Sequence, residues 1–192
     1  GEDHAATRYI FTRLNPITRF VFRADDDPLL KYLTDDGQSI EPDVFYPVIP
    51  MALVNGCHGI GTGWMTSVPS YNPRDVIANI RRHLAGERMQ DMSPWYKGFQ
   101  GEFEQKEGGG WTSRGCVRLE SAENGREEYI ITELPVGKWT ESYKEVLAQM
   151  QKDGFVERVT DYATDTLVRF EVLVNAKRMI RPKNFDPVVF FK

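Results

Sequence analysis

Side chains with the chemistry of a catalytic site are few and scattered in this 192-residue chain. The sequence has no phosphate-binding loop of the GxxxxGK[ST] type, no paired-histidine metal motif and no nucleophile elbow. His4, His58 and His83 lie far apart, and we expect His83 to be solvated on a predicted helix. The glycine-rich run 59–63 superficially resembles a dinucleotide-binding fingerprint, but the strand–turn–helix pattern of that motif does not accompany it. The common enzyme motifs therefore leave the chemistry undefined.

Acidic and thiol side chains do not form a recognisable metal site either. Three adjacent aspartates occupy positions 25–27, and adjacent carboxylates without an ordered loop are more typical of a solvated helix start than of metal ligation. Cys57 and Cys116 are far apart and lack the spacing of a metal or redox motif. The sequence predicts no metal ligands and two reduced thiols in an intracellular protein.

The charge distribution is uneven. The net charge of −4 argues mildly against a nucleic-acid partner, yet the first 23 residues carry four arginines against two acidic residues. No apolar run approaches the ~20 residues that a membrane span needs, and no signal peptide opens the chain. Because the chain begins with Gly1 and reads as mid-protein sequence, we expect it to be a segment of a longer protein.

Two helices are predicted from capping residues and apolar periodicity. The first begins after Asn72, has Pro73 in its first turn and ends at Gly86, and the second runs from near Thr140 to Gly154. A shorter helix is expected from Pro28 through Tyr32. The predicted core-facing stripes are Val76, Ile77, Ile80 and Leu84 in the first helix, and Tyr143, Val146, Leu147 and Met150 in the second.

Four strands are predicted, at 98–105, 116–120, 129–132 and 167–174, and the last alternates apolar and charged residues with the period of a sheet buried on one face. Glycine-containing turns at 108–110 and 123–125 connect neighbouring strands. The apolar run 45–54 contains two prolines and is expected to be buried extended chain. Four glycines follow it between positions 56 and 63, which indicates unusual backbone dihedrals or close approach to a ligand.

Three blocks in register resemble the breakage-reunion region of type IIA DNA topoisomerases. They are HAATRYIFT at 4–12, IPMALVNGCHGIGTGW at 49–64, and ELPV with the following WT and YKE between 133 and 145. The resemblance covers about 5–170 and is to the eukaryotic branch, whereas bacterial gyrase has a looser version of the first two blocks. Thr7 stands where many relatives have proline, and His4 replaces a common acidic residue.

The resemblance implies that Tyr9 is the catalytic nucleophile. A phenol keeps its proton at neutral pH and attacks poorly until the proton leaves or the phenolate is stabilised. The adjacent Arg8 guanidinium meets that need, and its planar fork can hold phosphate oxygens bidentately. Attack would form a 5′-phosphotyrosine ester and free a 3′-hydroxyl, which can later reseal the strand. Without the resemblance, a packed aromatic ring would be the expected role of this tyrosine.

The same resemblance implies several DNA contacts. Ile60 would act as a wedge between base pairs, since an apolar side chain flanked by glycines can enter a base step while the backbone approaches closely. Without the resemblance, an isoleucine packed in a turn would be expected. Trp139 aligns with a tryptophan placed against DNA, although by itself it is an aromatic residue before a helix start. Asn55 and Gly56 would line the same surface.

The implied fold is α+β: the C-terminal part of a winged-helix domain at 1–43, followed at 44–192 by part of a mixed α/β tower domain with a mainly antiparallel sheet. In the family, Mg²⁺ and ATP bind outside this segment, and the metal-binding domain comes from the partner protomer of a homodimer. Duplex DNA is the implied partner, cut transiently for ATP-dependent strand passage. The implied location is the nucleus, with an organelle or a viral factory as alternatives. We expect the segment alone not to cleave DNA.

Two other functions remain open. A relative that kept Ile60 and lost the chemistry would be a non-enzymatic DNA-bending module, against which Arg8 and Tyr9 argue. A structural interaction domain without a DNA role is compatible with the acidic charge balance.

Overall fold

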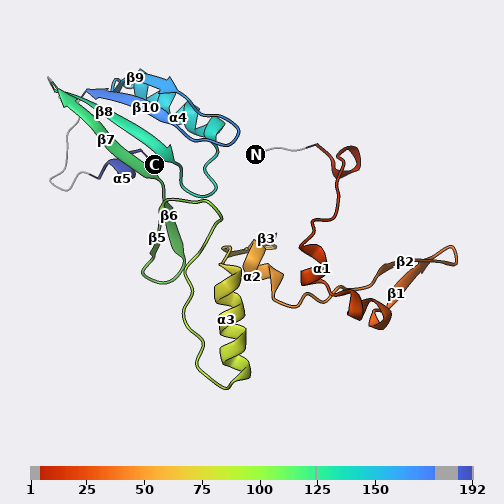
Figure 1. Ribbon diagram of the computed structural model, residues 1–192. Coiled ribbons are helices and arrows are strands. Elements are labelled where there is room, and N and C mark those ends of the chain that lie inside the picture. The colour runs from red at the N-terminus through yellow and green to blue at the C-terminus, as the bar shows by residue number, and fades with distance from the viewer. Residues whose placement is uncertain (1–4, 124, 176–185, 192) are drawn as a thin grey trace. The chain divides into compact units, whose positions relative to one another are not determined.

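The chain forms two compact units, Ala5–Tyr96 and Lys97–Lys192, in a computed structural model that describes residues 5–123, 125–175 and 186–191 (Figure 1). Helices and mainly antiparallel strands both contribute, which confirms the α+β class. The domain boundary expected after residue 43 stays a prediction. His4 and Asn124 lie outside the described residues.

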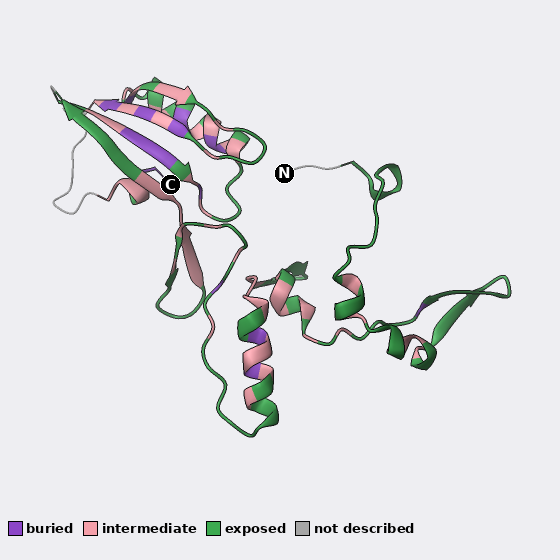
Figure 2. Ribbon diagram, in the orientation of Figure 1, coloured by how far each residue is buried: buried purple, intermediate pink, exposed green. Residues whose placement is uncertain are grey.

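The second unit is built on a four-stranded antiparallel sheet of order β7-β8-β10-β9. Its strands are β7 (Cys116–Glu123), β8 (Arg126–Glu133), β9 (Val156–Asp161) and β10 (Phe170–Asn175). Helix α4 (Thr140–Lys152) contacts β9 and shares the sheet's hydrophobic core (Figure 2). This unit contains the hydrophobic core of the described chain.

The core follows directly from sequence periodicity. In β10, Phe170, Val172 and Val174 are completely buried, and the residues between them are only partly covered, as alternation predicts. On α4, Tyr143 and Leu147 are buried one turn apart, with the other two residues of the predicted stripe packed beside them. Both predictions are confirmed.

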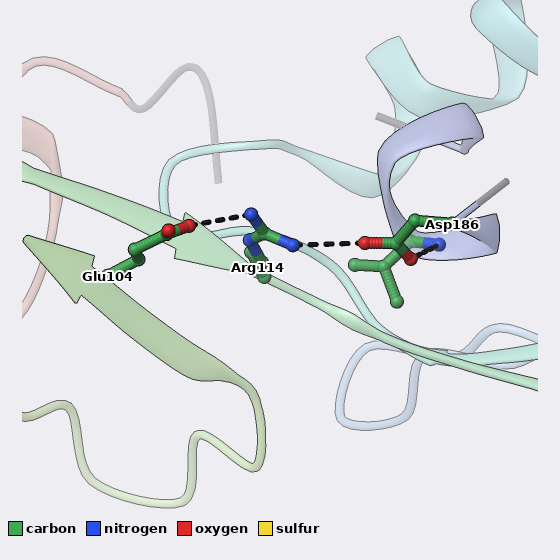
Figure 3. A network of polar contacts seen from close by, with 4 residues as sticks. Glu104, Arg114 and Asp186 are labelled. Atoms are coloured by element: carbon green, nitrogen blue, oxygen red, sulfur yellow. Dashed lines mark hydrogen bonds and ion pairs between the residues drawn. The ribbon is translucent and has the colours of Figure 1, made fainter. Parts of the chain in front are cut away.

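Two short elements, a hairpin and a helix, complete the sheet unit. β5 (Glu102–Gln105) pairs with β6 (Trp111–Arg114) across the predicted glycine turn, and α5 (Pro187–Phe190) lies near β7. Arg114 bridges the hairpin to the start of α5, with its guanidinium nitrogens 2.6 Å from Glu104 Oε2 and 3.0 Å from Asp186 Oδ2 (Figure 3). The buried Tyr143 hydroxyl donates a hydrogen bond of 2.8 Å to the Phe191 carbonyl oxygen. These contacts hold the end of the described chain against the core.

The first unit is a succession of small elements with little buried surface (Figure 2). In chain order they are η1 (Thr7–Tyr9), α1 (Thr18–Val21), η2 (Ala24–Leu29), β1 (Tyr32–Asp35), β2 (Gln38–Pro42), α2 (Met51–Asn55), β3 (Cys57–Gly61), β4 (Trp64–Val68) and α3 (Pro73–Leu84). Helix α3 begins as predicted, with the Asn72 side chain accepting a hydrogen bond of 3.0 Å from Arg74 N–H. His83 is exposed on it, as expected.

Three predictions in this unit were wrong. The helix expected through Tyr32 is a 3-10 helix that ends at Leu29, because pairing of β1 with β2 across a tight turn draws Tyr32 into a strand. The run 45–54 is neither buried nor wholly extended: both prolines precede α2 and so do not interrupt it, and several apolar side chains lie exposed. Leu84, at the last turn of α3, is exposed instead of facing a core.

Strand limits also differ from prediction. The strand expected from residue 98 begins at Glu102, since positive φ at Gly98 turns the preceding chain. The three other predicted strands exist, and β7 and β8 pair Glu123 with Arg126 across the expected turn. The hairpins β1–β2 and β3–β4, as well as β6 and β9, were not predicted.

Candidate functional site

The Arg8–Tyr9 pair lies in the single turn η1. The Tyr9 backbone N–H donates to the Ala6 carbonyl oxygen at 2.9 Å, and the chain is extended from Ile10 onward. Tyr9 is 75% exposed and Arg8 is exposed as well. Within the described residues, neither side chain makes a hydrogen bond or ion pair. Tyr9 is therefore not a packed core aromatic, and both groups can reach an external phosphate.

The first 23 residues contain four arginines, and two of them form ion pairs with aspartates of the run 25–27. Arg19 lies 3.0 Å from Asp27, and Arg23 lies 2.6 Å from Asp25. The exposed Asp25 and the partly exposed Asp27 therefore partner arginines, a role that sequence reasoning missed. Among the described residues, no group of three or more His, Cys, Asp or Glu side chains could hold a metal ion.

Ile60 lies in the β3–β4 hairpin, whose strands are joined by the two-residue turn of Thr62 and Gly63. Gly63 has φ +75°, which favours glycine at this turn. The Ile60 side chain is 80% exposed, so the structure contradicts the alternative of an isoleucine packed in a turn. Hairpin geometry holds the side chain on an open surface.

Glycines around Ile60 fall into two groups. Gly56 has φ +70°, and a Cβ there would come within 2.8 Å of the Val68 carbonyl oxygen, so the turn from α2 into β3 requires glycine. Gly59 and Gly61 have no positive φ, and a Cβ at either would meet nothing within 4 Å. The described chain supplies no packing reason for these two glycines, and they leave bare backbone on either side of Ile60.

Asn55 is the exposed last residue of α2, immediately before Gly56. Trp139 belongs to the other unit, where it occupies the N-cap position of α4 and its carbonyl oxygen accepts a hydrogen bond of 2.9 Å from Tyr143 N–H. Its ring is half exposed and lines a cleft of about 540 Å³. Arg8, Tyr9, Asn55, Gly56 and Ile60 share the first unit, whereas Trp139 does not.

The cleft beside Trp139 is polar. Lys144 in its wall lies 2.8 Å from Glu141 and 3.0 Å from Asp161, and hydrogen bonds to these carboxylates raise the pKa of Lys144. Burial opposes ionisation of Asp161, but hydrogen bonds from the Ala163 N–H and from Lys144 still lower its pKa. Lys144 is thus paired with acidic groups of its own chain.

Cys57 is exposed and Cys116 is partly covered, and both are free thiols, as expected. The Cys116 thiol donates a weak hydrogen bond of 3.4 Å to the Gln100 carbonyl oxygen. Burial, followed by the charges of Glu133 and Glu102, raises the pKa of Cys116. Across the described part of the chain, no helix is both long and apolar enough to cross a membrane.

Comparison with known proteins gives a consistent result. The family of DNA gyrase/topoisomerase IV A subunits matches residues 1–187. The chain is 44% identical over 186 residues to DNA topoisomerase 2 of Pisum sativum, covering 93% of this chain and 12% of that protein. It is 50% identical over 147 residues to DNA topoisomerase 2 of Candida albicans, covering 77% of this chain and 10% of that protein.

A solved structure agrees with these sequence relatives. The crystal structure of the Plasmodium falciparum topoisomerase II DNA-binding, cleavage and re-ligation domain superposes with a TM-score of 0.80 at 41% identity. The match covers 92% of this chain and 24% of that one. This chain thus spans only about 12% of the length of the curated relatives from Pisum sativum and Arabidopsis thaliana that it matches.

Proposed function

The chain belongs to the family of DNA gyrase/topoisomerase IV A subunits, and we propose that it is a segment of the DNA-cleavage core of a type IIA DNA topoisomerase. The observation that carries this proposal is the exposed Arg8–Tyr9 pair inside the matched region. Among the described residues the Arg8 guanidinium has no hydrogen-bond or ion-pair partner, so it can engage a backbone phosphate beside the accessible phenol without breaking such an interaction there. The proposal concerns the complete protein.

In the proposed reaction, the Tyr9 hydroxyl oxygen attacks a backbone phosphorus of duplex DNA. The bond between phosphorus and the 3′ oxygen breaks as the phenol loses its proton and the leaving 3′ oxygen gains one, which leaves a 5′-phosphotyrosine ester and a free 3′-hydroxyl. Arg8 stabilises negative charge on the non-bridging oxygens in the transition state. Because the ester conserves the broken bond, attack by the 3′-hydroxyl restores the strand and releases Tyr9.

The hairpin supplies the proposed DNA-bending contact. Ile60 enters a base step, and its chain neighbours Gly59 and Gly61 add no side chains that could obstruct the duplex. Asn55 and Gly56 border this surface, although the turn from α2 already accounts for a glycine at position 56. Trp139 is proposed to contact DNA from the other unit.

Mg²⁺ and ATP are proposed to bind elsewhere in the complete protein. The described residues contain no cluster of three metal-binding side chains, and Tyr9 and Arg8 are the groups that this chain contributes to the proposed reaction. The metal-binding domain would come from the partner protomer of a homodimer, so the segment alone should not cleave DNA. A nuclear location fits the eukaryotic relatives.

The direct test is Tyr9→Phe in the complete protein. Supercoil relaxation with ATP and Mg²⁺ should fall to background, because phenylalanine has no oxygen to form the ester. Thermal unfolding should not change, since the side chain is exposed. Tyr46→Phe is the matched control, an exposed tyrosine of the same unit. Normal relaxation by Tyr9→Phe would refute the proposal.

The exposed Ile60 also fits a second candidate, a DNA-bending module without cleavage. That protein would bend duplex DNA yet form no covalent adduct under any condition. Salt-dependent duplex binding separates both candidates from an interaction domain without a DNA role.

A further inference from the structure

We infer that Met65 also contacts DNA and acts with Ile60 as one two-residue wedge. This inference rests on the proposed function and extends it to a residue on the other strand of the hairpin. Its basis is the register of β3 and β4, in which Ile60 pairs directly with Met65.

Register places both side chains on one face of the ribbon. Directly opposite residues of an antiparallel pair point to the same side, with Cβ atoms about 4.5–5.5 Å apart. His58 and Ser67, two positions further from the turn, pair with each other and extend the same face. Ile60 and Met65 are therefore the apolar members of this face nearest the turn.

The opposite face is chemically different. Alternation puts Gly59 and Gly61 there, along with Trp64, the cross-strand partner of Gly61. Near the turn, the glycine face thus has one large apolar side chain, Trp64, whereas the other face has Ile60 and Met65 as a cross-strand pair. Insertion between bases requires side chains that project beyond the backbone, and the Ile60–Met65 face provides them.

Met65 is not part of a packed core among the described residues of its unit. Its side chain is 67% exposed, and that of the adjacent Trp64 is 85% exposed. Exposed apolar residues grouped on one short element mark a surface that another molecule covers. Family membership and the exposed arginine–tyrosine pair of the same unit favour duplex DNA as that molecule.

The two side chains have complementary properties for this task. Isoleucine is branched at Cβ and stiff, so it can hold a base step open. Methionine is unbranched, flexible and polarisable, and its sulfur makes favourable contacts with aromatic rings. Met65 would fill the space beside Ile60 as the bases tilt, which offsets part of the few kcal/mol that unstacking costs.

The experiment measures bending of a duplex labelled at both ends with a fluorescence energy-transfer pair, using the complete protein. Met65→Gln keeps the length of the side chain but makes it polar, and should lower the bent fraction at saturating protein about fivefold. Met65→Leu keeps the apolar volume and should bend DNA normally. Met89→Gln, an exposed methionine of the same unit, is the matched control and should have no effect.

A double substitution tests whether the pair acts as one wedge. Ile60→Ala combined with Met65→Gln should cause less loss than the product of the two separate effects. Normal bending by Met65→Gln would overturn the inference, as would a lower unfolding temperature in both Met65 variants, which would indicate a structural role.

The experiment distinguishes failure of the inference about Met65 from failure of the proposed Ile60 wedge. If Ile60→Ala lowers bending and Met65→Gln does not, only the inference about Met65 fails. If Ile60→Ala also bends DNA normally, the wedge in the proposed function fails, and the inference about Met65 fails with it.

Discussion

The two units of this chain divide stability and proposed chemistry between them. The unit Lys97–Lys192 contains the hydrophobic core cluster, whose buried members come from β8, β9, β10, α4, Leu134 and Phe191. In contrast, the unit Ala5–Tyr96 exposes most of its large apolar side chains and contains Arg8, Tyr9 and Ile60. The sheet unit packs apolar side chains against one another in its core. The first unit leaves most of its large apolar side chains accessible to a partner molecule.

This contrast makes substitutions in the two units separable. A change in the sheet core should alter the free energy of unfolding, whereas a change at an exposed candidate site residue should alter reaction with DNA alone. A residue that affected both equally would break the comparison.

The largest effect is expected from Phe170→Ala. Phe170 is fully buried against Tyr143 and the rest of the core, so its truncation should lower the free energy of unfolding by about 3–5 kcal/mol. Chemical denaturation measures this change. The matched substitution Phe11→Ala, in the first unit, removes an exposed ring and should cost almost nothing. Equal losses of unfolding free energy in the two variants would contradict the conclusion that the core of the described residues lies in the sheet unit alone.

Arg8→Ala should have a comparably large effect on chemistry alone. Loss of one preorganised charge at a developing oxyanion slows a reaction by about 10²–10³-fold, and we expect that reduction in the rate of DNA cleavage by the complete protein. Arg8→Lys should recover part of the rate, because lysine keeps the charge but not the bidentate fork. The unfolding temperature should stay constant in both. A fall in stability without a change in cleavage rate would assign Arg8 a structural role.

Tyr143→Phe should have a smaller effect, with a characteristic pH dependence. The buried Phe191 carbonyl oxygen would lose its donor, which costs about 1–3 kcal/mol. Burial raises the pKa of Tyr143 above its ordinary value. Since the unfolded phenol ionises near pH ~10 and the folded one does not, stability is full below that pH and is lost as pH rises further.

Denaturation between pH 8 and pH 12 tests this linkage. Tyr143→Phe should have a shallower alkaline loss of stability than the parent protein. An identical alkaline slope in the two proteins would show that Tyr143 ionises equally in both states.

The smallest effect is expected from Asn72→Ala, in the first unit. The substitution removes the side-chain cap of α3 and should cost about 1 kcal/mol. Hydrogen exchange of the α3 amides should accelerate, while that of the β8 and β10 amides should not, because the sheet belongs to the other unit. Faster exchange in both places would show that the units unfold together.

The elements that could be predicted from the sequence are those in which the apolar periodicity or capping residue matches the packing in the structure. β10 alternates strictly, α4 has four core residues at helical spacing, and α3 has Asn72 as its cap. The β3–β4 hairpin was missed because glycines at Gly59 and Gly61 obscure alternation. β9 was missed because charged residues interrupt a short strand whose pairing also has an irregular register.

Burial was harder to predict than secondary structure. The apolar run before α2 resembles core sequence, yet Phe45, Tyr46 and Val48 are exposed, because burial depends on what packs against a segment. The glycine cluster at 56–63 was also predicted only in part. Positive φ occurs at Gly56 and Gly63, but not at Gly59 and Gly61 beside Ile60. The site residues were found through family resemblance, and their roles stay predictions.

Chemical identification of the DNA–protein linkage tests the central proposal most directly. Cleavage by the complete protein can be stopped with denaturant, the DNA digested with nuclease, and the tryptic peptides sequenced by mass spectrometry. We predict a nucleotide joined through its 5′-phosphate to the hydroxyl oxygen of Tyr9. A nucleotide on another residue, or DNA cleavage without any adduct, would contradict the account.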